Sequence, residues 1–352
     1  MHRSEVLRSV YHCVRACLLP DRGLHAFLLA LALFGPTGCH SSRAPGKPLA
    51  RSGDEIMAAG QLFHTGTRVL LWMDPGGYDA YRVERRFAPI EESSWEKSKP
   101  KLPADSSPNR YGLRRERLTS NQIAQVRGGG WPLSLLQDVI DQFVIHFDAS
   151  GTSKRCFGVL HDKRCLSVHF MIDLDGTIYQ TLDLKERAWH ATTSNGRSIG
   201  VEMASPGAFG VAESDALNRW YREEPGQGTV LKLPEDGADS GFQVPGFVPR
   251  PARSGRILGR IQGKELQQYD FTQEQYEALT RLTATLCNVF PKLRCDYPKT
   301  AGGDLVREKL DDQTLKDYRG LIGHFHIQTD KIDPGPAFDW ERVTRGARRW
   351  IR

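Results

Sequence analysis

The sequence predicts an α/β protein of the mixed α+β kind, with helices flanking a central mixed β-sheet. Three observations support this fold class. The run QFVIHFDAS (142–150) is short and apolar, as in a buried central strand. Two β-type runs within 166–183 surround the turn Asp175-Gly176, which predicts a hairpin. Apolar residues recur at helical spacing over 271–290, which predicts a long helix.

The elements of the first part of the chain follow from the same kinds of pattern. TRVLLWM (67–73) predicts a strand ahead of a turn, whereas the polar, proline-containing stretch 85–120 predicts surface loops. RSIGVEMA (197–204) predicts another strand. Its alternation separates the apolar side chains from Gly200 and Glu202, which share the opposite face.

The second part of the chain predicts an insertion, a capped helix and a final strand. The stretch at about 205–265 is rich in glycine, proline and charged residues, which is typical of a long insertion. The helix at 271–290 has Thr272 as its N-cap and Gln275 three residues later, as in a capping box. RGLIGHF (319–325) predicts a last short strand or loop.

The N-terminal residues predict an exported protein. Residues 1–38 combine an arginine-containing start, the apolar run LHAFLLALALF and a zone of small residues, as in a signal peptide. Cys39 follows Gly38 directly, as in bacterial lipoproteins. We therefore expect lipidation at Cys39, a tether over 39–60, and a periplasmic protein anchored to the outer membrane. Cleaved soluble export and an uncleaved anchor (or a wrong start codon) are the alternatives.

Beyond the tether we expect an N-terminal extension over 61–125 and a catalytic domain over 126–345 that contains the insertion. Charged residues make up 26% of the chain, and the formal net charge of +6 is spread out without a basic stripe. This distribution argues against a nucleic-acid partner. We expect a monomer.

Four cysteines beyond the lipidated one form two closely spaced pairs. In an oxidising compartment, Cys156 with Cys165 and Cys287 with Cys295 would form two disulfides. A zinc site made from all four is the alternative. Neither pair has the tight spacing that structural zinc sites use, so the disulfides are preferred.

Five polar residues could carry chemistry: His146, Glu202, His324, Lys331 and Asp333. Each also has a structural reading, such as a hydrogen-bonded strand histidine or an aspartate that forms a turn before Pro-Gly. Together, two histidines and a carboxylate match a zinc site with an open fourth position. Glu202 would then suit a general base, and Lys331 an electrostatic stabiliser. Spacing alone does not assemble this set, because its members lie far apart in the sequence.

The motifs VIHFDAS, SVHFMIDLDGTIYQ, AWHA, SIGVEM and GHFHIQTDKIDPGPAFDW occur in one order along the chain. That order resembles the zinc-dependent N-acetylmuramoyl-L-alanine amidases, the type 2 amidase group that includes phage T7 lysozyme and the peptidoglycan recognition proteins. The resemblance covers residues 140–205 and 270–342. Where some members have a cysteine and a tyrosine, this chain has Asp333 and Val168, which resembles the branch that uses a glutamate and a lysine.

The resemblance implies that His146, His324 and Asp333 bind Zn²⁺, with Glu202 as the catalytic base and Lys331 near the reacting carbonyl. It implies hydrolysis by zinc-activated water of the amide between the lactyl group of N-acetylmuramic acid and L-alanine. The partner would be peptidoglycan or muropeptides. The fold of the family, a mixed sheet with helices packed on it, agrees with the predicted elements.

We expect four further residues near the substrate: His190, Asn195, Arg197 and His169. His326 competes with His324 as a ligand, although the Gly-His motif favours His324. Two other functions remain open, a peptidoglycan-recognition module without catalysis and a zinc peptidase acting within the stem peptide. The complete ligand set favours the amidase over the recognition module.

Overall fold

The computed structural model describes residues 45–98, 109–226, 228–233 and 240–352. Within these ranges, residues from Arg51 onward form one compact unit. The predicted signal peptide and Cys39 lie outside the described residues. No described helix has both the length and the apolar character needed to cross a membrane.

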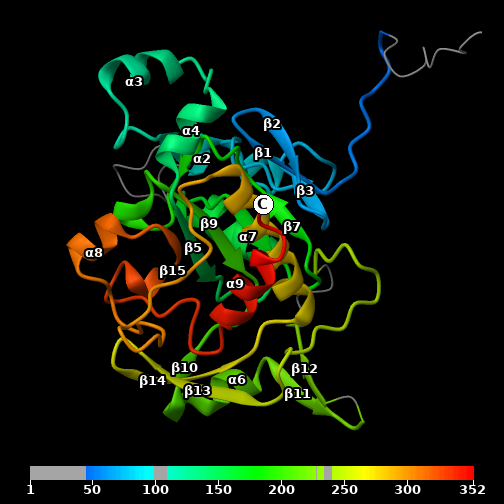
Figure 1. The fold of residues 1–352 in the computed structure, drawn as a ribbon. Coiled ribbons are helices and arrows are strands. Elements are labelled where there is room, and N and C mark those ends of the chain that lie inside the picture. The colour runs from blue at the N-terminus through cyan, green and yellow to red at the C-terminus, as the bar shows by residue number, and fades with distance from the viewer. Residues whose placement is uncertain (1–44, 99–108, 227, 234–239) are drawn as a thin grey trace, which may run out of the picture. The chain divides into compact units, whose positions relative to one another are not determined.

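A six-stranded mixed sheet forms the centre of the unit (Figure 1). Its strands, in spatial order, are β15 (Gly320–Gly323), β5 (Gln142–Phe147), β9 (Ser198–Met203), β6 (Phe170–Ile172), β7 (Ile178–Gln180) and β3 (Val69–Leu71). Neighbouring strands run parallel except for the hairpin pair β6 and β7. The structure therefore confirms the predicted fold class. It contains the predicted central strands, the hairpin and the strand at 69–71 within one mixed sheet.

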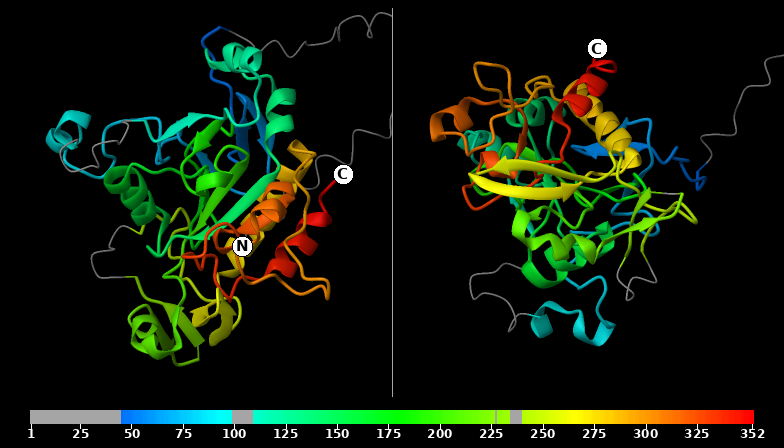
Figure 2. Two further views of the ribbon diagram at one scale, coloured as in Figure 1. Left: turned by 90° about the vertical axis from the view of Figure 1, so that its left-hand side faces the viewer. Right: turned by 90° about the horizontal axis from the view of Figure 1, so that it is seen from below.

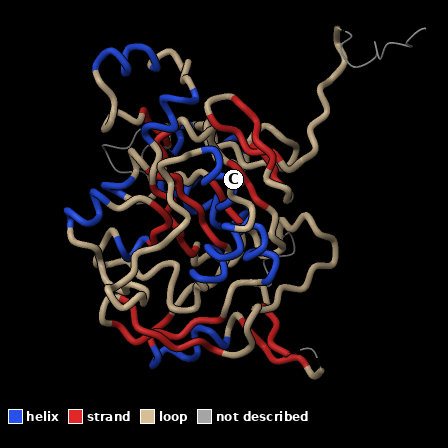
Figure 3. The backbone as a smooth tube through the Cα atoms, viewed as in Figure 1, coloured by secondary structure: helices blue, strands red, loops and turns tan. Residues whose placement is uncertain are grey.

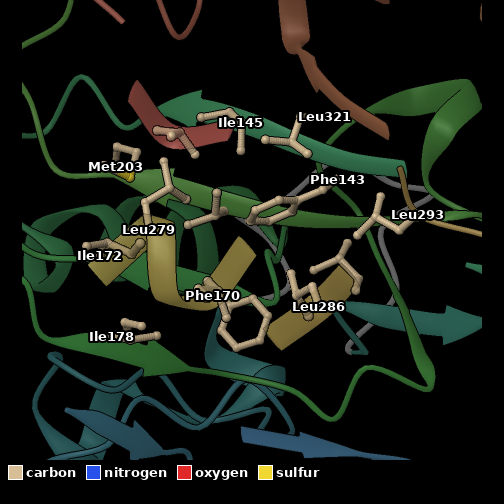
Figure 4. Close-up of a cluster of buried hydrophobic side chains, with 14 of the residues drawn as sticks. Phe143, Ile145, Phe170, Ile172, Ile178, Met203, Leu279, Leu286, Leu293 and Leu321 are labelled. Carbon is tan, nitrogen blue, oxygen red and sulfur yellow. The ribbon is translucent and has the colours of Figure 1, made fainter. Parts of the chain in front are cut away.

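Helix α7 (Gln273–Val289) covers one face of the sheet. The predicted capping box is present, because Thr272 and Gln275 exchange side-chain and main-chain hydrogen bonds. The rings of Phe271 and Tyr276 meet edge to face at 6.0 Å. Figure 4 shows the apolar cluster between α7 and the sheet, to which the strands contribute residues such as Phe143, Ile145, Phe170 and Met203. The polar members of the same strands therefore face the other way.

Shorter helices complete the layers. On the face opposite α7, α5 (Ser153–Phe157) and the π-helical turn η3 (Gly158–Lys163) pack near β6 and β7, and α8 (Asp312–Asp317) packs near β5 and β15. Helix α9 (Trp340–Arg348) lies beside α7 (Figure 1), and α4 (Leu133–Val139) precedes β5. A 3-10 turn, η4 (Thr192–Ser194), precedes β9, and another, η6 (His324–His326), follows β15.

The N-terminal part is more ordered than its sequence predicts. A hairpin of β1 (Glu55–Ala58) and β2 (Gln61–His64) occupies the end of the predicted tether, and Ile56 is fully buried. The predicted loop stretch contains η1 (Ile90–Glu92), α2 (Trp95–Ser98) and β4 (Tyr111–Leu113), before α3 (Ser120–Val126). Strand β4 pairs with β8 (Glu186–Ala188). Within the described part of the predicted tether, the structure contradicts the prediction only at β1, which pairs with β2 just beyond it. Within the predicted loop stretch, β4 is held by strand pairing, whereas η1 has no buried residue.

The described part of the stretch at 205–265 contains several short strands joined by loops (Figure 3). It contains β10 (Phe209–Gly210), η5 (Val211–Glu213), α6 (Ser214–Asn218), β11 (Tyr221–Glu224), β12 (Gly228–Leu231) and β13 (Arg256–Ile261). Strand β13 pairs with β14 (Lys264–Tyr269) in a long hairpin, drawn in yellow in Figure 2, and β10 adds to the far edge of β14.

The four described cysteines are free thiols in the structure. The thiols of Cys287 and Cys295 lie within hydrogen-bonding reach of each other. Both predicted disulfide pairings, including Cys156 with Cys165, stay predictions.

Candidate active site

Two of the candidate residues occupy matching positions on neighbouring parallel strands. His146 of β5 and Glu202 of β9 are register partners close to the carboxyl ends of both strands. Their apolar neighbours Ile145 and Val201 point into the core beneath α7. The main-chain ladder therefore places a histidine and a glutamate side by side on the face opposite α7.

The other candidates come from the loop after β15. Gly323 is the register partner of Ile145, so His324, the next residue, lies beside His146. The chain then turns through η6 and returns, and the N–H of Phe325 donates to the carbonyl of Asp333 at 3.3 Å. This contact brings the Asp333 carboxylate back to the two histidines.

Three ligand atoms converge at this point. His146 Nδ1 lies 2.8 Å from Asp333 Oδ2 and 3.1 Å from His324 Nδ1, and His324 Nδ1 lies 3.1 Å from the same carboxylate oxygen. All three side chains are buried. In a tetrahedral zinc site with bonds of roughly 2.0–2.1 Å, ligand atoms lie about 3.3 Å apart. The three-atom arrangement is close to this spacing.

The hydrogen bond on the far side of the His324 ring assigns its proton, and the contacts of His146 are compatible with the same assignment. His324 Nε2 lies 2.7 Å from Gln328 Oε1, an amide oxygen that can only accept, so Nε2 holds the proton. His146 Nε2 lies 3.0 Å from His190 Nδ1, and His190 Nε2 lies 3.3 Å from Ser198 Oγ. With His146 Nε2 donating, both Nδ1 lone pairs and a carboxylate oxygen face one point. Three acceptors this close repel one another unless a cation lies among them.

The electrostatics of the ligand set agree with a neutral histidine beside an ionised carboxylate. Burial is the largest influence on the pKa of His146 and lowers it, while the bond to Asp333 acts in the opposite direction. Burial alone would raise the pKa of Asp333, but its interactions with His324 and His146 hold that pKa well below its ordinary value, so the carboxylate is ionised. Neutral imidazole and carboxylate are the forms that bind metal ions.

Glu202 has the properties of a catalytic acid–base group. Burial, followed by the charges of Asp333 and Asp148, raises its pKa well above the ordinary glutamate value. Its Oε2 is buried and has no hydrogen-bond partner among the described residues. A buried carboxylate oxygen without a partner is costly, and its position in a cleft indicates a function.

A cleft of about 440 Å³ opens onto these groups. All five candidates border it: His146, Glu202, His324, Lys331 and Asp333. Its other walls are largely apolar, and Arg164 adds a second cation beside Lys331. A larger groove of about 1060 Å³ lies along α7 and the C-terminal residues, but it contains none of the candidates. The chemistry therefore belongs to the smaller cleft.

Two of the four predicted substrate-binding residues reach the cleft. His190 and Asn195 both line it. Asn195 Oδ1 accepts from the N–H groups of His190 and Ala191, so its carboxamide also fixes this loop. A Cβ atom at position 200 would lie 2.5 Å from the His190 ring, which explains the glycine in that strand. The structure thus gives His190 a second role, as the hydrogen-bond partner of His146.

The other two predicted substrate residues do not line the cleft. Arg197 Nε bonds to Asp141 at 2.5 Å, and its remaining nitrogens donate to main-chain carbonyls, including that of Tyr318 at 2.9 Å. His169 is fully buried, and its Nδ1 accepts from the N–H of Gly200 at 3.1 Å. The structure therefore corrects their placement, because their polar atoms are used inside the framework.

Sequence reasoning missed two residues that support the site. Gln328 holds His324; it lies within the motif GHFHIQTDKIDPGPAFDW, but no role was assigned to it. Arg114, in the stretch predicted to be loop, is fully buried and donates to the carbonyls of Leu184, Asn195 and Gly196. Burial lowers its pKa to about 9. The partners of Arg114 lie 70 to 82 residues away in sequence, so local sequence could not indicate its role. Gln328 lies four residues after His324, and only the structure shows that its side chain turns back to that ring.

His326 is not part of the ligand cluster. Its Nδ1 accepts from the N–H of Gly323 at 2.9 Å, and its Nε2 lies 2.8 Å from the carbonyl of Val306. With both ring nitrogens engaged, it serves to fold the loop that carries His324.

Comparison with known proteins gives one family. The family model described as N-acetylmuramoyl-L-alanine amidase (Amidase_2) matches residues 136–336, which is more than half of the chain. No curated protein sequence matches the chain significantly.

Several solved structures are similar at low identity. A selenomethionine derivative of AmpD is 16% identical, with 72% of this chain and 97% of that chain covered and a TM-score of 0.34. The amidase AmiD from E. coli, in complex with anhydro-N-acetylmuramic acid-L-Ala-D-γ-Glu-L-Lys, is also 16% identical, with 66% and 61% covered and a TM-score of 0.33. The endolysin LysCS from Clostridium intestinale is 14% identical, with 62% and 88% covered and a TM-score of 0.30.

Proposed function

Because this chain belongs to the N-acetylmuramoyl-L-alanine amidase family, we propose that it is a zinc-dependent peptidoglycan amidase. Its substrate is the amide that joins the lactyl group of N-acetylmuramic acid to the L-alanine of the stem peptide. His146, His324 and Asp333 would hold the metal through two Nδ1 atoms and one carboxylate oxygen. The observation that carries this proposal is the convergence of three unprotonated ligand atoms beside the buried carboxylate of Glu202.

When bound, zinc would make a water molecule more acidic and polarise the scissile carbonyl. The residues of the chain supply the rest. Glu202 accepts the proton of the attacking water and then delivers it to the departing amine of L-alanine. Its raised pKa makes the carboxylate a stronger base than an ordinary glutamate, which favours its taking up the proton. Lys331, on the same cleft wall, stabilises the negative charge that develops on the lactyl carbonyl oxygen.

The cleft also fits the shape of this substrate. Its apolar walls accommodate the lactyl and alanyl methyl groups, and His190 and Asn195 line the same cleft. Lys331 and Arg164 both line the cleft, and their positive charges complement the carboxylates of a stem peptide.

The proposal is tested by product analysis. Purified protein loaded with zinc is incubated with peptidoglycan sacculi, and the products are identified by mass spectrometry. The expected products are glycan with a free lactyl carboxylate and stem peptides with a free L-alanine amino terminus. Cleavage between amino acids of the stem would instead identify a peptidase, and release of stem peptide by Glu202→Ala at the wild-type rate would overturn the mechanism.

We also propose export and lipidation at Cys39, on the basis of the N-terminal sequence alone. In a cell fractionation experiment, the wild-type protein should sediment with membranes. A Cys39→Ala variant should move to the soluble fraction, and its failure to do so would remove the lipid anchor from the account.

A further inference from the structure

The β13–β14 hairpin reaches the loop that carries His324. Gln262, at the tip of the hairpin, donates through Nε2 to the carbonyls of Phe325 at 2.7 Å and Gln328 at 3.0 Å. The side-chain oxygen of Gln262 accepts from the N–H of Lys309 at 3.2 Å. Because its amide oxygen and nitrogen are both engaged, the orientation of this side chain is fixed.

The same hairpin contacts the turn that carries Asp333. Gln268 of β14 is fully buried, donates to the carbonyl of Pro334 at 3.2 Å and accepts from the N–H of Ala337 at 3.0 Å. A Cβ atom at Gly335 would lie 2.2 Å from Gln268 Oε1, and Gly335 has a φ of +84°. Glycine therefore allows the turn to lie directly against the hairpin.

Gln328 joins the hairpin to the ligand set. Its main-chain carbonyl is held by Gln262, and its side-chain Oε1 accepts from His324 Nε2 at 2.7 Å. An imidazole has two ring nitrogens and, when neutral, one proton. An acceptor at Nε2 therefore keeps the proton there and leaves Nδ1 free, with the ring turned so that Nδ1 faces His146 and Asp333.

We propose that Gln328 is a positioning residue for His324, and that Gln262 acts through it, so that the hairpin of the 205–265 stretch controls the affinity of the zinc site. This inference rests on the proposed function, because it assigns these residues a purpose in metal binding. Without the Gln328 acceptor, His324 can place its proton on Nδ1 or turn its ring, and either change removes a ligand.

The test measures zinc affinity rather than activity, by competition with a chromophoric chelator on the full chain. Gln328→Leu should bind zinc about 10- to 100-fold more weakly than wild type, the range for loss of a ligand's hydrogen-bond partner. Gln328→Glu keeps an acceptor at the same place and should bind at least as tightly as wild type. Gln313→Leu, on the exposed surface of α8, is the matched control and should change nothing.

A double-mutant cycle tests whether Gln262 acts through Gln328. Gln262→Ala alone should weaken zinc binding, and adding it to Gln328→Leu should cause little further loss. Fully additive losses of zinc affinity would show that Gln262 does not act through Gln328. Unfolding temperatures of the metal-free variants are recorded alongside, so that general loss of structure is recognised.

A second readout follows the tautomer itself. In long-range ¹⁵N–¹H spectra of metal-free protein, His324 of the wild type should be protonated at Nε2, and Gln328→Leu should move proton population to Nδ1. Unchanged zinc affinity and tautomer in Gln328→Leu would overturn the inference while leaving the proposed function intact. If the wild-type protein binds no zinc, the proposed function fails and the inference fails with it.

Discussion

The two halves of the proposed zinc site are held in place by different means. His146 and Glu202 are register partners on adjacent parallel strands, so the main-chain hydrogen bonds of the sheet set their positions. His324 and Asp333 follow the end of β15, and their loop is held by the side-chain amides of the β13–β14 hairpin. The main-chain hydrogen bonds between strands remain when one side chain is removed. The hydrogen bonds from a glutamine side chain are lost when that glutamine is replaced. The strand half should therefore be robust and the loop half sensitive to changes outside the ligands.

The largest loss of zinc affinity is expected when a ligand is removed, and it should be similar in both halves of the site. His146→Ala and His324→Ala each remove one ligand. If zinc binding is worth roughly 10–16 kcal/mol over four ligands, each loss costs about 3 kcal/mol or more, at least about a hundredfold in affinity, and activity should fall to background. Chelator competition and a sacculus-release assay measure the two effects.

Two histidines outside the cluster serve as controls for these ligand variants. His64→Ala, on an exposed side chain, and His326→Ala should both retain stoichiometric zinc. Because the His326 side chain is buried, the unfolding temperature of the His326→Ala variant is measured as well. Loss of zinc from a folded His326→Ala variant would contradict the ligand assignment.

A second large effect separates catalysis from metal binding on the strand half. Glu202→Gln should lower the hydrolysis rate about 10²- to 10⁴-fold, the usual contribution of an acid–base group, with zinc affinity unchanged. Since Glu202 must be ionised to accept a proton and burial raises its pKa, wild-type activity should rise with pH above the ordinary glutamate range. That rise should be absent in the variant. Glu277→Gln, exposed on α7, is the matched control, and a fully active Glu202→Gln enzyme would refute the assignment.

A third prediction concerns the support of the strand half by the N-terminal extension. Arg114→Met leaves three buried carbonyls without donors, which should lower the free energy of unfolding by about 3 kcal/mol or more. The measurement is urea denaturation of wild type and variant. The neighbouring Arg115 is exposed, so Arg115→Met should leave the unfolding curve unchanged. Equal stability of Arg114→Met and wild type would show that the Arg114 hydrogen bonds do not stabilise the fold.

The smallest effect sharpens the comparison between the halves directly. His190→Ala removes the hydrogen-bond partner of His146, as Gln328→Leu removes that of His324. Because the strand still positions His146, zinc affinity should fall by less than about tenfold, and by less than in Gln328→Leu. Chelator competition on both variants decides the order. A larger loss at His190 would mean that the sheet register does not protect the strand half.

The elements that could be predicted from the sequence are those with a strong local pattern. The alternation in SIGVEM and the capping box at Thr272 predicted β9 and the start of α7 correctly. The ordered motifs indicated His146, Glu202, His324, Lys331 and Asp333, and the structure brings all of them to one cleft.

The parts that could not be predicted depend on contacts between distant segments. The charged side chain of Arg197 suits a substrate contact. It instead binds Asp141, which is 56 residues away in sequence, and local sequence could not indicate this pairing. Gln262 lies outside the quoted motifs, and its hydrogen bond to the main-chain carbonyl of Gln328 is specified only by the folded loops. Ile56 lies in a polar stretch that resembled a tether, and only strand pairing buries it.

The most direct test of the account is diffraction from a zinc-loaded crystal recorded on both sides of the zinc absorption edge. The account predicts one anomalous peak bonded to Nδ1 of His146, Nδ1 of His324 and the carboxylate of Asp333, with Gln328 accepting from the opposite nitrogen of His324. A cleft without a peak, or zinc held by His326 or by the Nε2 atoms, would contradict it.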